Sequence, residues 1–519
     1  MPEVQKLFVI IYAIVKDLLP LEVSNKSIYY SLFTKLVTIC LAVVLLSIIF
    51  VILVPFASLR LCIGLSLKIF HGKYYGGLLS GLDTLFEMNP NKTVINVINI
   101  YASKDNPKIT IEKLKNVIYQ IYNSSFKFSS HIQRCLGYCY FVKDQVDFED
   151  VIDVTRLNEE EYMTKQMLFD YLEDNSLTLK ENQMWKVIIF SQPILWSRDT
   201  KDEYKQYVII WTLRHSLGDG PSIVTIFQKY AVEDGPQTEA DLKNLERLRK
   251  IQKPRVNLDN VCLRRNPVTT KLDGLALKID GNSKWHIASF IETQPKYVSV
   301  VKKIKDELNI SFTEVISAAI IASVYDYIKQ RKVTLDNFTI AKVIRLKMED
   351  LIKLKNGTYK FEEIKNNFGL VAFKLPQNLD GRTMKSLIQY LQHYNESLRY
   401  AVDPIVAYTF LDSICTYLPI NMTRVSCTSF MDSMTIGVTN LVGFQKSRLC
   451  DNVVDDVFFF APGILNTGFT FSIFSYEGRL QIILTSREGF VKDRDDLQKI
   501  LNNVFSHIGR VQKEIGLGN

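Results

Sequence analysis

The sequence has few cysteines for its 519 residues, and the eight that it has are scattered. The closest pair, Cys135 and Cys139, has no second pair and no histidine cluster near it that would complete a metal-binding spacing. The sequence also lacks a zinc-finger spacing and any other nucleic-acid-binding signature. We therefore expect reduced thiols in a cytosol-facing protein, with no bound metal and no nucleic-acid partner.

A strong excess of either charge is also missing. The formal net charge is +8, which favours anionic lipid surfaces or a phosphorylated ligand, although ordinary solvated surface accounts for most such charge. The hydrophobic fraction of 47% excludes global disorder, and the length allows either several domains or one large two-lobed domain. Neither a GxSxG nucleophile elbow nor a paired Cys–His signature is present, so no acyl-enzyme is expected.

One long stretch carries no charge at all. As a helix, residues 36–59 would span roughly 36 Å, which exceeds the ~30 Å hydrocarbon core of a bilayer. The run starts too late and is too long for a signal peptide, so we predict a transmembrane helix within an N-terminal anchor region of residues 1–77. A second apolar run, residues 61–67, either extends this span or returns it as a hairpin. Residues 7–15 are long enough only to lie in the interface.

The clearest chemical signal follows a buried strand. Residues 207–213 are apolar, aromatic and β-branched, a composition typical of a core strand. The strand leads into Arg214, His215 and a turn that contains Asp219 and Gly220. A histidine mounted there is fixed and partly shielded from water, and its ordinary pKa of about 6.5 lets it take a proton from a hydroxyl. A structural histidine is the alternative for a single His–Asp spacing.

The residues from His215 to Gly220, HSLGDG, form an HxxxDG motif. It resembles the core motif of the wax ester synthase/diacylglycerol O-acyltransferase family, within the superfamily of CoA-dependent acyltransferases. That family has two adjacent histidines, of which the second is the base; here Arg214 takes the first position and His215 the second. The resemblance implies that His215 is the general base. It also implies that Asp219 organises the turn or pairs with a distant arginine, and that Gly220 permits close packing.

Two further motifs follow in the family's order. Residues 366–376, NNFGLVAFKLP, match an asparagine, a Phe-Gly pair and an apolar strand that ends in proline. Residues 440–443, NLVG, resemble the Asn-Val-Pro-Gly turn that borders the active-site tunnel in the family. An asparagine amide there can donate to a developing oxyanion, although an asparagine that only caps the turn is an equal alternative. The candidates for substrate binding or oxyanion stabilisation are therefore Arg214, Asn367, Asn440 and Gly443.

The resemblance covers nearly all of residues 78–511 and implies an α/β fold. It is the two-lobed CoA-dependent acyltransferase fold, of the chloramphenicol acetyltransferase-like type, with mixed sheets and a channel that reaches His215 between the lobes. We predict an N-terminal lobe at residues 78–236, a crossover linker at 237–290 and a C-terminal lobe at 291–519. The linker is polar and charge-rich, and its basic residues either contact the phosphates of CoA or are simply solvated.

The implied reaction moves a long-chain acyl group from acyl-CoA to a fatty alcohol, to diacylglycerol, or to both, which makes wax esters or triacylglycerol. Acyl-CoA is then a co-substrate, and no metal or redox cofactor is needed. Attachment to the lipid bilayer concentrates these substrates. Basic residues flank the predicted span, and the positive-inside rule favours a cytosolic catalytic domain. We expect it at the endoplasmic reticulum, the plasma membrane or a lipid-droplet surface.

A second function class stays open. A catalytically inactive, membrane-tethered lipid-binding or scaffold protein on the same fold would tolerate departures from the family motifs. Such departures are Arg214, the pair Thr313–Glu314 where the family has Asn-Asp, and Val442 where it has proline. The complete HxxxDG motif argues against this alternative.

Overall fold

The computed structural model describes most of the chain. The described residues are 7–8, 11–12, 15, 28–88, 93–104, 107–143, 148–175, 179–196, 203–223, 226, 284–332, 338–345, 364–376, 378–398, 408–431, 434–441, 447–463 and 467–517. Most of the predicted crossover linker and Gly443 lie outside them.

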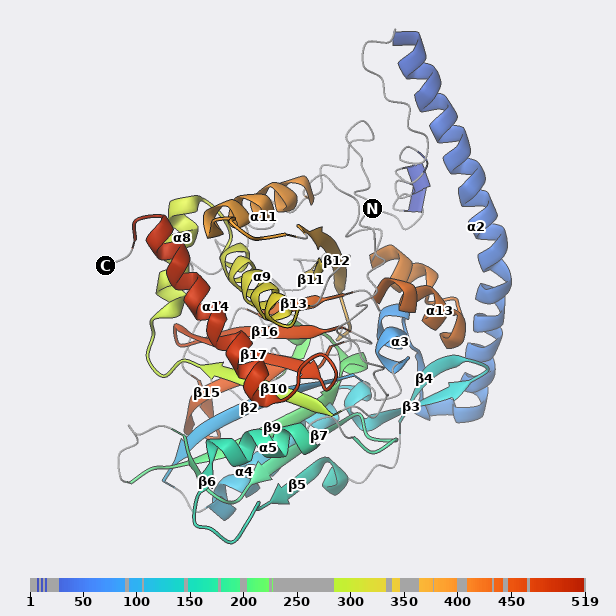
Figure 1. Ribbon diagram of the computed structural model, residues 1–519. Helices are drawn as coiled ribbons and strands as arrows, with labels where there is room; N and C mark the ends of the chain where they lie inside the picture. Colours follow the sequence, from blue (N-terminus) through green and yellow to red (C-terminus); the bar gives the residue numbers. More distant parts are fainter. Residues whose placement is uncertain are drawn as a thin grey trace.

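Two six-stranded sheets form the centre of the two lobes (Figure 1). The first has the order β14-β15-β2-β9-β7-β5 and the second β10-β17-β16-β13-β11-β12. The strands of the first are β2 Val94–Ser103, β5 Ile152–Thr155, β7 Trp185–Phe190, β9 Lys205–Arg214, β14 Arg448–Leu449 and β15 Asn452–Phe460. Those of the second are β10 Trp285–Ile291, β11 Phe338–Arg345, β12 Phe368–Leu375, β13 Ile436–Leu441, β16 Phe469–Tyr476 and β17 Arg479–Arg487.

The first sheet is apolar on both faces because both are covered. Along β9, Val208 and Ile210 face one hydrophobic cluster that includes α5, whereas Ile209 and Trp211 face another that includes α4. This alternation follows from the two-residue period of a strand and puts His215, just beyond β9, on the α4 side. The helices of this lobe are α3 Gly81–Glu87, α4 Pro107–Ser124 and α5 Lys165–Asn175, with short helices η2 Phe126–Ser129, η3 Phe148–Val151 and η4 His215–Leu217.

The second sheet is covered by a layer of helices (Figure 1). Helix α9 is almost entirely buried, and its N-terminus carries a capping box in which Ser311 and Glu314 satisfy each other's backbone N–H groups. The helices of this lobe are α8 Tyr297–Leu308, α9 Phe312–Gln330, α11 Met384–Leu398, the π-helix η6 Thr409–Ile414, α13 Ile420–Met431 and α14 Arg494–Glu514. Smaller sheets join β1 Tyr75–Leu78, β3 Ser130–Cys135 and β4 Tyr138–Lys143, and β6 Met163–Thr164 with β8 Ile194–Leu195.

The two lobes exchange structure, which corrects the predicted lobe boundaries. Strand β15 lies late in the sequence, yet it pairs antiparallel with β2 and extends the sheet of the N-terminal lobe. The linker predicted at 237–290 also ends too late, because β10 begins at Trp285 and pairs along its whole length with β17. Segments far apart in the chain thus build each sheet, and this fixes one lobe against the other.

A long helix precedes the two lobes. Helix α2, Ile28–His71, is one helix of 44 residues, equivalent to ~66 Å. It stands along one side of the molecule and extends beyond it (Figure 1). Within the described residues it is the one single helix long and apolar enough to cross a membrane, and little of its apolar window is buried. Its last turns continue through η1, Gly72–Tyr74, into β1.

Candidate active site

His215 lies where the two lobes meet. It follows β9 directly, and its backbone N–H donates to the carbonyl of Thr93, 2.9 Å away, which fixes the strand end. The imidazole stacks on the ring of Phe86 in α3, with centroids 3.7 Å apart and ring planes 9° from parallel. A ring held on one face and at its backbone has little freedom to turn.

One side-chain amide from the C-terminal lobe determines the chemistry of this ring. The Nδ1 atom of His215 lies 3.0 Å from Oδ1 of Asn366. Asn366 is the first residue of the NNFG turn, which leads into β12. The amide nitrogen of Asn366 donates to the carboxylate of Asp83 and to the backbone carbonyl of His215, both at 2.8 Å. Because a backbone carbonyl can only accept, the amide nitrogen must face it, and Oδ1 must face the imidazole.

The environment keeps the imidazole neutral. His215 is only partly exposed, and its burial is the largest influence on its pKa, which it lowers below the ordinary value of 6.5. The hydrogen bond that His215 donates to Asn366 and the nearby charge of Asp219 oppose the shift without reversing it. Nε2 has no hydrogen-bond partner among the described residues. The ring therefore offers a lone pair at Nε2 at neutral pH.

Asp83 is tied to the other side of the site. Lys127 lies 3.5 Å from its second oxygen and donates to the carbonyl of Leu217 at 3.4 Å. Asp83 therefore connects α3, the NNFG turn and the HxxxDG turn. Sequence analysis assigned no role to Asp83, Phe86 or Asn366. Of the three, only Asn366 belongs to a motif that the sequence analysis singled out, residues 366–376.

Asp219 organises two turns rather than facing a substrate. Its Oδ1 accepts from the backbone N–H and the hydroxyl of Ser222, at 3.1 and 2.6 Å. Its Oδ2 accepts from the backbone N–H of Asn367 at 3.2 Å. The structure thus gives Asp219 the turn-organising geometry that the resemblance implies, and it places Asn367 in the same contact through its backbone.

The lobes approach closely at the glycines of HxxxDG. A Cβ atom on Gly220 would lie 2.7 Å from a methyl group of Leu441 in the NLVG turn. One on Gly218 would lie 2.9 Å from Ile364, just before the NNFG turn. Glycine at both positions lets the two C-terminal turns close over His215.

The prediction that Arg214 contacts substrate is wrong. Its side chain is 1% exposed and points into a structural network. Its guanidinium lies 3.5 Å from the carboxylate of Glu87 and donates to the carbonyls of Lys180 and Glu181.

The remaining candidates divide. The amide of Asn440 donates to the hydroxyl of Thr313 at the start of α9, at 2.9 Å, so it ties the NLVG turn to that helix. The oxyanion role of Asn440 stays a prediction, as do roles for Asn367 and for Gly443, which lies outside the described residues. In the part of the chain that the structure describes, no three His, Cys, Asp or Glu side chains form a group able to hold a metal ion.

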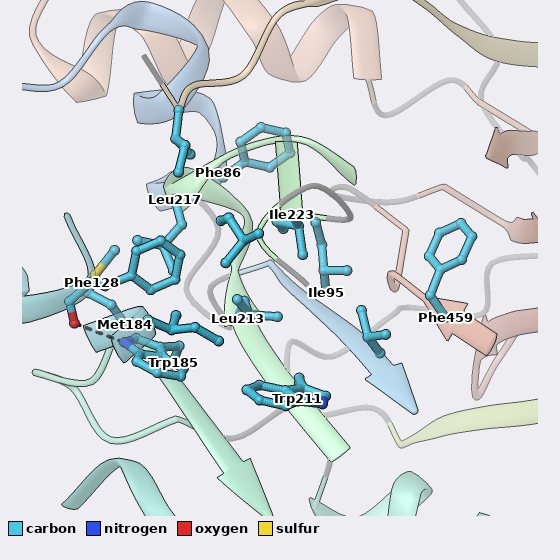
Figure 2. Packing of buried hydrophobic residues seen from close by; sticks show 14 of the residues in the cluster. Phe86, Ile95, Phe128, Met184, Trp185, Trp211, Leu213, Leu217, Ile223 and Phe459 are labelled. Carbon is cyan, nitrogen blue, oxygen red and sulfur yellow. Dashed lines mark hydrogen bonds between the residues drawn. The ribbon is translucent and has the colours of Figure 1, made fainter. Parts of the chain in front are cut away.

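A small apolar cavity lies on the same face of the sheet as His215. Aromatic rings and aliphatic side chains alone line it, among them Phe128, Trp185, Trp211 and Ile223. Figure 2 shows these side chains packed between the sheet and the segment after HxxxDG, with the indole of Trp185 bonded to the carbonyl of Phe128 at 2.9 Å. Trp185 thus has a packing role.

The comparisons with known proteins agree with this geometry. Residues 364–509 match the family model of the WS/DGAT C-terminal domain, which begins at the NNFG region and includes the NLVG turn. Over these residues the chain is similar to the WS/DGAT C-terminal domain. The match agrees with the resemblance that the NNFG and NLVG motifs carry, whereas HxxxDG lies outside the matched residues. None of the curated proteins searched matches the sequence.

Solved structures confirm the fold. A wax ester synthase/diacylglycerol acyltransferase from Marinobacter aquaeolei is 14% identical, with a TM-score of 0.54 over 85% of this chain and 100% of that chain. The epimerization domain of tyrocidine synthetase B is 11% identical, with a TM-score of 0.51 over 86% and 98%. Trichothecene 15-O-acetyltransferase from Fusarium sporotrichioides is 9% identical, with a TM-score of 0.51 over 83% and 94%. The chain thus has the predicted two-lobed fold of the CoA-dependent acyltransferases.

Proposed function

We propose that this acyltransferase of the WS/DGAT family moves a long-chain acyl group from acyl-CoA to a lipid hydroxyl at a membrane, with His215 as general base. The acceptor is a fatty alcohol, a diacylglycerol, or both. The observation that carries the proposal is the hydrogen bond between His215 Nδ1 and Asn366 Oδ1. It puts the ring proton on Nδ1 and leaves Nε2 to take a proton.

The reaction needs such a base because a neutral alcohol is a poor nucleophile. As the hydroxyl oxygen attacks the thioester carbonyl, its proton passes to Nε2 of His215, and a tetrahedral oxyanion forms. The intermediate collapses to the ester, the C–S bond breaks, and the CoA thiolate receives the proton from Nε2. The ring ends neutral, and no covalent intermediate with the protein is formed.

Asn366 and Asp83 act as positioning residues in this scheme. Asn366 selects the tautomer, and its amide is itself fixed by Asp83. A positioned general base contributes typically ~10²–10⁴-fold to a rate, and only if its lone pair is aimed at the reacting proton. Asp219 holds the HxxxDG turn against the NNFG turn, so it maintains the same alignment from the other side.

Helix α2 supports action at a membrane. Its apolar window is long enough to span a bilayer, and most of its side chains have no protein to cover them. Long-chain acyl-CoA, fatty alcohols and diacylglycerol all concentrate at lipid surfaces, so anchoring raises their effective concentration. We place the protein in the endoplasmic reticulum or plasma membrane, or at a lipid-droplet surface, with the catalytic region on the cytosolic side.

Release of free CoA tests the proposal. Purified protein receives palmitoyl-CoA with either hexadecanol or dioleoylglycerol, and His215→Ala is the control. Release with at least one acceptor that the variant abolishes supports acyl transfer and identifies the acceptor class. If neither acceptor gives release above the variant, catalysis on these acceptors is refuted, and the inactive lipid-binding or scaffold alternative is favoured.

A further inference from the structure

Three segments meet at Arg60, in the C-terminal part of α2, and there we look for a second membrane contact. The guanidinium of Arg60, in α2, lies over the ring of Tyr138, 5.9 Å from its centroid. The hydroxyl of Tyr138 donates to the carbonyl of Tyr417 at 2.8 Å, and the N–H of Ile420 donates to the carbonyl of Gly137 at 2.7 Å. The turn between β3 and β4 is therefore bound to α2 on one side and to the start of α13 on the other.

Large apolar side chains are exposed at this junction. Leu61 is 63% exposed, Leu136 73% and Val425 72%, and Met422 on the same side of α13 is exposed as well. Scattered single residues of this kind are normal on soluble proteins, whereas a contiguous group marks an interaction site.

Leu136 is unusual in a second way. It has a φ of 47° and precedes Gly137 with a φ of 84°, at the tip of the β3–β4 hairpin. Asparagine or aspartate is preferred at such a position, because a bulky side chain is strained in the left-handed region. A leucine here combines strain with exposure, so neither folding nor solubility explains it. Contact with an apolar environment does.

The charges around the junction fit a lipid surface. Residues 59–75, 130–143 and 417–431 contain no aspartate or glutamate. Their basic residues are Arg60, Lys68, Lys73, Arg134, Lys143 and Arg424. Apolar side chains that enter the acyl region, with cations and tyrosines around them, are the pattern by which proteins bind the surface of an anionic bilayer.

The depth is also right. The uncharged run of α2 ends at residue 59, and Arg60 is the first charge that follows it. The hairpin meets α2 at this residue and is bonded to the start of α13, so both would lie near the headgroups of a bilayer spanned by the uncharged run. The junction adjoins the site as well, because the N–H of Gly81, at the start of α3, donates to the hydroxyl of Thr416 at 2.6 Å. Helix α3 carries Asp83 and Phe86.

We propose that Leu61, Leu136, Met422 and Val425 form a membrane-docking platform that enters the headgroup–acyl boundary of the bilayer spanned by α2. The inference rests on the proposed anchoring by α2 and adds a second contact to it. With the platform docked, α3 is held near the bilayer surface, so an acceptor dissolved in the membrane meets the enzyme beside His215. The ligand class is anionic phospholipid together with the lipid acceptor.

Tryptophan reporters test this proposal in the full chain. Leu136→Trp and Val425→Trp are each reconstituted into phosphatidylcholine–phosphatidylserine vesicles, with or without bromine on the lipid acyl chains. Ile109→Trp is the matched control, because Ile109 is an exposed apolar residue of α4, away from the platform. Bromine quenches the fluorescence of an indole only on contact. The emission of the four native tryptophans is measured in the unsubstituted protein and subtracted.

The platform predicts a loss of emission and a blue shift for both platform reporters, and neither change for Ile109→Trp. Platform reporters quenched no more than the control, in protein that resists carbonate extraction, would overturn the platform and leave the anchor in place. A blue shift without quenching would mean that protein covers the patch, and it overturns the proposal too. Carbonate-extractable protein would overturn anchor and platform together, while CoA release reports separately on acyl transfer.

Discussion

The substitution Asn366→Ala removes both contacts that this side chain makes with His215. These are the bond to Nδ1 at 3.0 Å and the bond to the backbone carbonyl at 2.8 Å. Neutral hydrogen bonds of this kind contribute about 0.5–1.5 kcal/mol each, so the two bonds that align the imidazole together contribute about 1–3 kcal/mol, which the substitution removes. If that alignment is used in the transition state, kcat falls by roughly 5- to 150-fold, at 1.36 kcal/mol for each factor of ten.

The pH profile separates positioning from general damage. The hydrogen bond that His215 donates to Asn366 raises the pKa of His215, whereas burial lowers this pKa by more. Its removal therefore lowers that pKa further, and the acid limb of the kcat profile moves to lower pH. A purely structural role moves the melting temperature and leaves the midpoint of that limb unchanged.

The assay is CoA release against pH with saturating palmitoyl-CoA and the preferred acceptor. Asn123→Ala is the control, because it removes an exposed amide on α4 that bonds only to the helix backbone. We expect kcat to fall in Asn366→Ala, with a small change in KM. A variant whose kcat stays within twofold and whose acid limb does not move would refute the tautomer argument.

Three other predictions follow from particular contacts. In the unsubstituted protein, the midpoint of the acid limb of kcat/KM lies below 6.5, because burial lowers the pKa of His215 and favours its neutral form; a midpoint above 6.5 would contradict this. Arg479→Met removes the guanidinium that lies 2.7 Å from the buried carboxylate of Asp456. The free energy of unfolding should therefore fall by ~3–5 kcal/mol in a denaturant titration. Gly81→Ala should lower the melting temperature strongly, since its Cβ would lie 1.8 Å from the backbone oxygen of Leu411; an unchanged melt would show that α3 can shift.

Sequence patterns found what is local in this fold. The apolar run before HxxxDG, in which polar and apolar residues do not alternate, predicts a buried strand, and β9 is that strand. A Glu-Gly pair between two apolar runs is typical of a hairpin, and β16 and β17 turn through Glu477 and Gly478, both with positive φ. Such signals depend on neighbours in the chain, so they are readable without the tertiary structure.

What depends on distant partners was missed. Nothing within residues 452–460 indicates that they join a sheet built from the other lobe, because any apolar strand accepts several partners. Arg214 was judged by the histidine that it replaces in the family, whereas its role is set by Glu87, far away in sequence. Asn366 and Asp83 had no assigned chemistry until the fold brought them to His215, since a hydrogen bond across 283 residues leaves no local pattern.

The central claim is that Nε2 of His215 takes the proton of a lipid hydroxyl. Ester formation by His215→Gln in vesicles tests it most directly, because glutamine approximates the ring in size and polarity and cannot serve as a base near neutral pH. The account predicts a loss of at least about 100-fold in kcat, the contribution expected of a positioned general base, with the protein still folded and membrane-bound. A variant that forms ester within threefold of the unsubstituted rate would contradict it.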